Sequence, residues 1–129
     1  MKLIYLRLGT NDLEKARGFY DATFAVLGLP PSSLQADPPY LAYSIPGGPS
    51  FSVGAPRNGE PATFANGGTI MFTTESDAQV AAWHAAGLAH GGTCEGRPEP
   101  KPKANGAFGA YLRDPDGNKL CCYHGITFD

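Results

Sequence analysis

The sequence predicts an α+β fold of two tandem β-α-β-β-β modules, on three observations. Short alternating runs typical of half-buried strands open both halves of the chain. In each half, a helical apolar pattern then follows a capping sequence. Matching residues stand a constant 64 positions apart, so that Phe19-Tyr20 corresponds to Trp83-His84 and Gly28 to Gly92. Because each module has one helix to cover one sheet face, its other face must pack against its twin.

The length of 129 residues favours one domain. We expect module one at about residues 1–59, a linker at about 60–68 and module two at about 69–129. The chain carries 10 Lys and Arg against 12 Asp and Glu, a net charge of −2 without a basic run, which argues against nucleic acid as a partner. No apolar stretch approaches the roughly 20 residues that span a bilayer, so we expect no membrane partner.

The compartment predicted from the sequence is the cytoplasm. The first residues run directly into a strand pattern, without a signal segment. Three cysteines, an odd number, fit a reducing environment.

In the first module, a strand is expected from Leu3 to Leu8. Asn11 as N-cap, with Glu14 three residues later, predicts a helix that ends at Gly28 before two prolines. Two strands joined by a Pro-Gly-Gly-Pro turn are expected to follow, Tyr40–Ile45 and Ser50–Gly54.

The second module repeats this order. A strand is expected over Thr69–Thr73, and Ser76 with Gln79 forms a capping box before a helix that ends at Gly91-Gly92. Residues 95–106, rich in proline, are expected to form an irregular loop. Two final strands, joined by the turn Asp114-Pro115-Asp116-Gly117-Asn118, are expected over Phe108–Arg113 and Lys119–Tyr123.

These residues carry a family resemblance. Asp12-Leu13-Glu14, Phe19-Tyr20, Gly28 and the hairpin from Asp114 to Leu120 resemble the glyoxalase, bleomycin-resistance and ring-cleaving dioxygenase superfamily, the vicinal oxygen chelate fold. The resemblance covers essentially the whole chain. It implies an open, curled sheet around a cavity with the helices on the outer face, and a small-molecule ligand that is often held through a metal. It also implies a homodimer, because relatives complete sheets or cavities across a two-fold interface.

The four positions that bind metal in such relatives are occupied here by Tyr5, Ser52, Thr69 and Cys121. A phenol, two hydroxyls and a thiol do not form the imidazole and carboxylate set that divalent metals need. We therefore expect these side chains to converge on the cavity floor with no metal and no cofactor.

The cysteines and histidines near the C-terminus form no second metal set. Cys121 and Cys122 alternate to opposite faces, so Cys122 is interpreted as a buried apolar residue and His124 as a surface group. His84 and His90 are interpreted as structural. A reactive-thiol role for Cys121 would require a nearby cation, either Arg7 or Arg113.

Alternation predicts the cavity wall. Met71 lies two residues beyond Thr69 and so points to the same side, together with Tyr5, Arg7 and Tyr123. Arg7 should pair with an acidic or carbonyl oxygen of the ligand, unless a protein carboxylate takes it instead. The predicted ligand-binding set is Tyr5, Arg7, Ser52, Thr69, Met71, Cys121 and Tyr123.

The function predicted first is metal-free binding of a small organic molecule by a glyoxalase-like homodimer. The alternative is a lyase, isomerase or dioxygenase of the same superfamily, acting either with a divalent metal on other ligands or through Cys121 and Tyr5 as catalytic residues. A pure interaction module is a third class, disfavoured because two paired modules naturally enclose a cavity. Phosphate-loop and nucleophile-elbow motifs are missing from the sequence.

Overall fold

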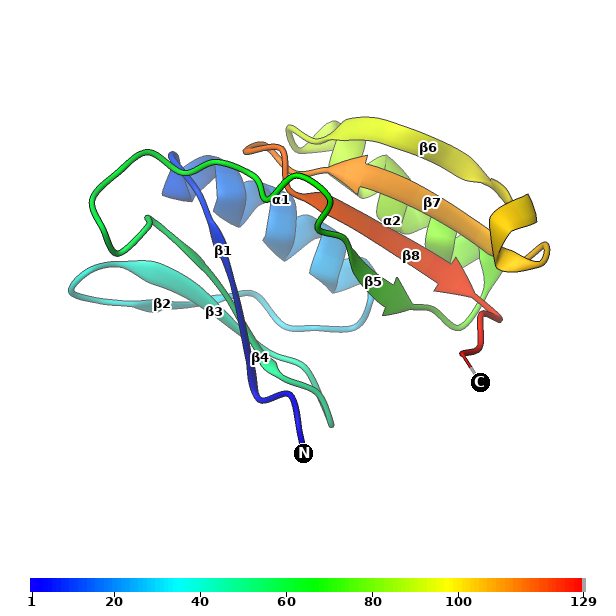
Figure 1. Ribbon diagram of the computed structural model, residues 1–129, viewed down its shortest axis with the longest axis horizontal. Helices are drawn as coiled ribbons and strands as arrows, with labels where there is room; N and C mark the ends of the chain where they lie inside the picture. Colours follow the sequence, from blue (N-terminus) through cyan, green and yellow to red (C-terminus); the bar gives the residue numbers. More distant parts are fainter. Residues whose placement is uncertain (129) are drawn as a thin grey trace.

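Two β-α-β-β-β modules follow one another in the computed structural model, which describes residues 1–128 (Figure 1). The elements of the first module are β1 (Tyr5–Gly9), α1 (Leu13–Val26), β2 (Ser33–Gln35), β3 (Tyr40–Ser44) and β4 (Ser50–Gly54). Those of the second are β5 (Ile70–Thr73), α2 (Asp77–Ala89), β6 (Thr93–Pro100), the 3₁₀ turn η1 (Pro102–Ala104), β7 (Phe108–Arg113) and β8 (Lys119–His124).

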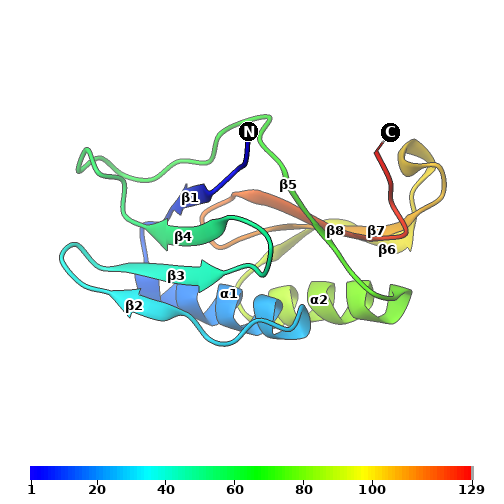
Figure 2. The same cartoon turned by 90° about the horizontal axis from the view of Figure 1, so that it is seen from below.

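Each module forms its own four-stranded mixed sheet, and neither sheet closes into a barrel. The strand orders are β1-β4-β3-β2 and β5-β8-β7-β6. The outer pairs β1–β4 and β5–β8 are parallel, and the other pairs are antiparallel. Figure 2 shows both helices in one layer, with the first sheet over α1 and the second over α2. Each sheet therefore keeps one face toward a helix and one open face.

The two helices begin at equivalent positions. Asp12 caps α1 by accepting from the Lys15 N–H at 3.1 Å, and Ser76, 64 residues later, caps α2 through the Gln79 N–H at the same distance. The expected Asn11 cap is wrong by one residue, because the Asn11 side chain instead bonds the linker backbone at Ala62.

The helix ends correspond at an offset of 63 rather than 64. The helix α2 has 13 residues and α1 has 14, so the positive φ that follows each helix falls on Gly28 and on Gly91. The expected match of Gly28 with Gly92 is therefore one residue out. Glycine suits both positions because a positive φ costs it no Cβ clash.

The interpretation of residues 95–106 as an irregular loop is wrong over its first half. The strand β6 pairs with β7 there, and register shifts between Cys94 and Gly96 and between Gly96 and Glu99 absorb its glycine and prolines. As an edge strand, β6 tolerates proline without losing ladder bonds on its free side. The short strand β2 completes the first sheet, and the sequence around it shows no clear alternation that predicts a strand.

The two modules share one hydrophobic core. The Phe24 ring of α1 lies edge-on to Phe72 of β5, with centroids 5.4 Å apart. Gly87 allows α2 to pack closely against Leu112 of β7 and Phe19 of α1, because a Cβ at this position would collide with Leu112 and lie 3.2 Å from the Phe19 ring. The modules therefore depend on each other for burial of apolar surface.

A buried polar cluster joins the β7–β8 turn to the first module. The Tyr20 hydroxyl of α1 donates to Asp114 Oδ2 at 2.5 Å, and both residues are almost fully buried. Asn118 donates to the same carboxylate oxygen at 2.8 Å and to the Gly9 carbonyl at 3.2 Å. The turn predicted from Asp114–Asn118 is thus also an inter-module contact.

Within residues 1–128, no helix is long and apolar enough to cross a membrane.

Candidate functional site

The open faces of the two sheets carry six of the seven predicted ligand-binding residues, divided into two groups. We call Tyr5, Arg7 and Ser52, on β1 and β4, the first half-site. We call Met71, Cys121 and Tyr123, on β5 and β8, the second half-site. Alternation places both groups opposite the core side chains of their strands. The seventh residue, Thr69, is exposed just before β5.

Arg7 dominates the first half-site. Its Nη2 donates to the Ala55 carbonyl at 3.0 Å, and its guanidinium lies over the Tyr40 ring, 5.3 Å from the centroid. Gly54 makes room for it, because a Cβ there would lie 2.7 Å from Nη2. The second terminal nitrogen, Nη1, is buried without a hydrogen-bond partner, and no carboxylate of the described chain pairs with Arg7.

Ser52 is the register partner of Arg7 across β1 and β4. Its hydroxyl is also buried without a partner, and the residue is 1% exposed. The neighbouring Ser52 hydroxyl and then the Arg7 guanidinium lower the pKa of the exposed Tyr5 phenol. Three polar groups of the first half-site therefore meet on one face, and two of them have unused hydrogen-bonding capacity.

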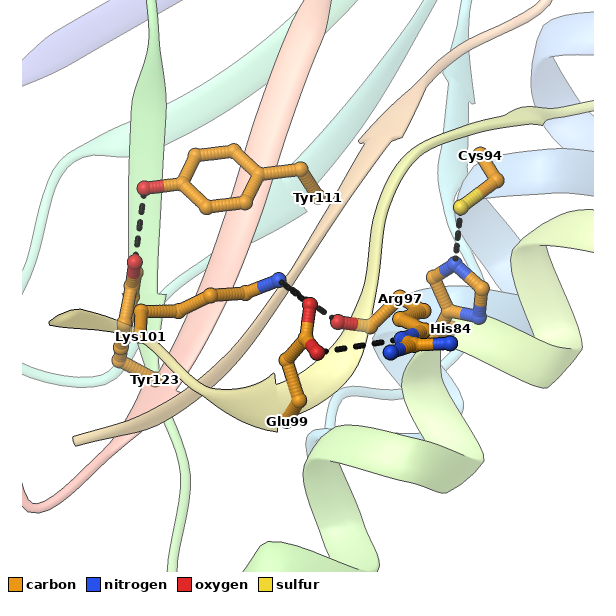
Figure 3. A network of polar contacts seen from close by, with 7 residues as sticks. All are labelled: His84, Cys94, Arg97, Glu99, Lys101, Tyr111 and Tyr123. Carbon is orange, nitrogen blue, oxygen red and sulfur yellow. Dashed lines mark hydrogen bonds and ion pairs between the residues drawn. The ribbon is translucent and has the colours of Figure 1, made fainter. Parts of the chain in front are cut away.

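In the second half-site, two tyrosines form a hydroxyl pair. Tyr111 and Tyr123 lie edge to face with their oxygens 2.8 Å apart (Figure 3). Gly109 permits this arrangement, because a Cβ at that position would overlap the Tyr123 ring. Burial and the bond with Tyr111 raise the pKa of Tyr123, so its phenol is neutral at ordinary pH.

Cys121 lies between Met71 and Tyr111, its register partners on either side. It is fully buried, and burial raises its pKa to about 11 in spite of the nearby Lys119. The thiol is therefore protonated at neutral pH, which weakens its case as a nucleophile. Neither Arg7 nor Arg113 supplies the expected activating cation: Arg7 lies on the other sheet, and Arg113 bonds Glu95 and the Gly117 carbonyl.

Lysines surround the second half-site. Lys119 and Lys101 lie over the Tyr111 ring, with their Nζ atoms 5.3 and 5.9 Å from its centroid. Lys101 also bonds Glu99 at 3.0 Å. A hollow beside them contains both tyrosines as well as Lys103. Each half-site thus offers cations, although the whole chain is slightly acidic.

The metal positions suggested by the family resemblance do not fit a divalent ion. Tyr5 and Ser52 lie on the first sheet, Cys121 lies on the second, and Thr69 precedes β5. Within residues 1–128, no three His, Cys, Asp or Glu side chains lie close enough together to hold a metal. Phenol, hydroxyl and protonated thiol groups are poor ligands for Zn²⁺ or Mn²⁺.

Sequence reasoning missed several members of the site. Tyr111 is the register partner of Cys121, and a hairpin register counted back from the Asp114–Asn118 turn identifies it. Gly54 and Gly109 act through close approach, which leaves no pattern in the sequence. Tyr40 of β3 contacts Arg7 of β1 across the intervening strand β4.

The fold and its polar open faces place the chain among proteins built from paired β-α-β-β-β modules. It belongs to the Glyoxalase/Bleomycin resistance protein/Dioxygenase superfamily, whose family model matches residues 2–122. The search of curated proteins gives no match.

Solved structures share the fold over nearly the whole chain. A glyoxalase/bleomycin resistance protein from Albidiferax ferrireducens is 44% identical, with a TM-score of 0.85, and the match covers 95% of this chain and 98% of that one. A lactoylglutathione lyase from Agrobacterium tumefaciens is 26% identical, with a TM-score of 0.64 and coverage of 95% and 92%. A glyoxalase-related enzyme from Fulvimarina pelagi, 19% identical with a TM-score of 0.78 and coverage of 99% and 98%, shares the fold.

Proposed function

We propose that this protein binds a small organic molecule with an acidic or carbonyl oxygen on its open sheet faces, without the metal common in the superfamily. The observation that carries the proposal is the pair of unpartnered buried groups, Arg7 Nη1 and Ser52 Oγ, on adjacent strands of one face. A buried donor without a partner costs about 1–3 kcal/mol, so such groups need an explanation. A ligand oxygen between them would satisfy both.

The chemistry of the half-sites supports an oxygen-rich ligand. A guanidinium donating to a carboxylate forms one of the stronger hydrogen bonds in proteins. Tyr40 and the tyrosine pair offer ring surface for an organic scaffold. We therefore expect a carboxylic acid, or a carbonyl compound of similar shape, rather than a hydrocarbon.

We also propose that the protein acts as a homodimer in which a second copy completes the cavity. The half-sites lie on separate sheets, so one chain offers two incomplete surfaces. Leu3 and Ile4, beside the first half-site, are 62% and 71% exposed, and an apolar groove of about 400 Å³ extends from Leu3 to Met71. Exposed apolar surface of this kind is typical of interfaces.

The three unpaired cysteines fit the cytoplasm, which we keep as the proposed compartment.

Calorimetry on substitutions tests the binding proposal. Protein purified without chelator is analysed for metal and screened by thermal shift against small carboxylic acids. For a ligand so identified, Arg7→Met should weaken binding about tenfold to a hundredfold, the value of a charge-assisted bond. Lys15→Met, an exposed cation on α1, is the matched control and should leave the affinity unchanged. Unchanged affinity with reduced stability in Arg7→Met would show that Arg7 is structural.

The alternative is a lyase, isomerase or dioxygenase that uses Tyr5 with Cys121, or a divalent metal on other ligands. The observation in its favour is the lowered pKa of the Tyr5 phenol, which suits an acid–base group. Stoichiometric metal in the native protein, lost in Cys121→Ser, would support this alternative over metal-free binding.

A further inference from the structure

A thiol and an imidazole meet on the other side of the second sheet. Cys94 of β6 is exposed, and its Sγ lies 3.2 Å from Nε2 of the buried His84 on α2 (Figure 3). With the ring proton on Nδ1, Nε2 accepts from the thiol. The pair therefore combines the thiol of an exposed residue with an imidazole in direct contact.

This pair is separate from both half-sites. Cys94 is the register partner of Leu112, whose side chain is buried in the core, so Cys94 belongs to the helix-facing side of the sheet. The half-sites lie on the opposite, open side. Ligand binding there makes no use of His84 or Cys94.

The other cysteines and histidines of the chain do not form a comparable pair. Cys121 and Cys122 are fully buried, and burial raises the pKa of each. The other imidazoles have oxygen partners: His90 contacts the Ala86 carbonyl, and His124 contacts Asp77. Within residues 1–128, Cys94 and His84 form the one thiol–imidazole hydrogen bond.

The surroundings keep the imidazole neutral. Burial, and secondarily the positive charge of Lys101, lower the pKa of His84. Lys101 also belongs to an ion-pair network with Glu99 and Arg97 at the edge strand, which Figure 3 draws together with the pair. A neutral imidazole can accept a proton at neutral pH, which a charged one cannot do.

We propose that Cys94 is a reversible S-thiolation site at which His84 acts as the base toward low-molecular-weight disulfides. The Cys94 proton passes to His84 Nε2 as the sulfur attacks one sulfur of the disulfide. A Cys94–S–S–R bond forms and the R–S–S–R bond breaks, and the proton on His84 passes to the leaving thiolate, giving R–SH, or to water where that thiolate is weakly basic. Cys94 is oxidised and half of the disulfide is reduced, so the step is balanced. A thiol reductant reverses it.

Dithiobis(nitrobenzoate) is the probe, because it releases a coloured thiolate and leaves a mass tag on the modified peptide. The native protein should react once, at Cys94, and dithiothreitol should remove the adduct. His84→Gln should slow the reaction about tenfold or more near neutral pH, the loss of a general base. His90→Gln, at the end of the same helix, is the matched control and should react at the wild-type rate, and Cys94→Ser should not react.

The wild-type pH profile provides a second test that does not require a variant to fold. A base-assisted thiol retains more of its rate at about pH 6.5 than free N-acetylcysteine does, because the imidazole rather than hydroxide takes the proton. Equal rates in folded His84→Gln and wild type, or a wild-type profile matching N-acetylcysteine, would overturn the proposal. First labelling at Cys121 or Cys122 in the native state would also overturn it.

Discussion

Replacing Tyr20 by Phe removes one oxygen from the buried cluster that joins the modules. The ring stays packed, since Phe fills the same volume, but Asp114 Oδ2 loses a donor at 2.5 Å and retains Asn118 at 2.8 Å. A hydrogen bond to a charged group contributes about 1.5–3 kcal/mol, and burial prevents water from replacing the hydroxyl. We therefore expect Tyr20→Phe to lower the free energy of unfolding by about 1.5–3 kcal/mol.

Urea unfolding, followed by circular dichroism, measures this loss. Tyr43→Phe is the matched control, because its hydroxyl also donates to a carboxylate, Asp21 Oδ1, at 2.6 Å. The Asp21 side chain is 28% exposed, so water can take the hydroxyl's place, and we expect a loss of about 1 kcal/mol or less. A loss in Tyr20→Phe no greater than that in Tyr43→Phe would refute the argument that the inter-module bond is the stronger one.

Three further predictions concern burial and protonation. Gly109→Ala should destabilise the protein by about 1–3 kcal/mol in thermal or urea unfolding, because the new methyl displaces the Tyr123 ring; an unchanged midpoint would contradict this. The pKa of His84 is lowered by folding, so this residue binds fewer protons in the folded than in the unfolded state, and the free energy of unfolding should fall as the pH drops below about 6.5. In urea titrations at several pH values, His84→Gln should reduce this dependence of the free energy of unfolding on pH. Cys121 should resist iodoacetamide in native protein and react after unfolding, as mass spectrometry would show; rapid native labelling would disprove the burial argument.

The helices could be predicted closely from the sequence because their signals are local. The cap at Ser76 with Gln79 is confirmed, and the offset between the modules holds at both N-caps. The Asn11 prediction is wrong for a physical reason. Asp12 is also a good N-cap residue, and the Asn11 side-chain amide forms two hydrogen bonds with the Ala62 backbone, a contact that no local pattern reveals. Competition between neighbouring cap residues is decided by tertiary contacts.

The strand β6 was hidden for a different reason. Its sequence contains two prolines, a glycine and four charged or polar residues, the composition of a loop. Pairing with β7 imposes the extended conformation, and bulges accommodate the residues that do not fit. Tertiary pairing here outweighs local preference.

The sequence predicts which sheet face carries the candidate site residues, but not how these residues are distributed between the two sheets. Alternation correctly groups Tyr5 with Arg7, and Met71 with Cys121. It cannot show that these pairs lie on two separate sheets, since that depends on how the modules pack. The unused hydrogen-bonding groups of Arg7 and Ser52 are a property of the folded chain alone, because partners distant in the sequence determine which atoms remain free.

The inter-module contact made by Tyr20 and Asp114 limits the pseudo-symmetry of the fold. The turn of the first module, residues 45–49, contains no aspartate, and the residue equivalent to Tyr20 in the second helix, His84, contacts the Cys94 thiol instead. One position of the repeated helix therefore has two different polar partners: a carboxylate of the other module in α1, and a thiol of its own module in α2. The two modules are thus equivalent in backbone but not exchangeable, because only the first helix provides the hydroxyl that holds the β7–β8 turn.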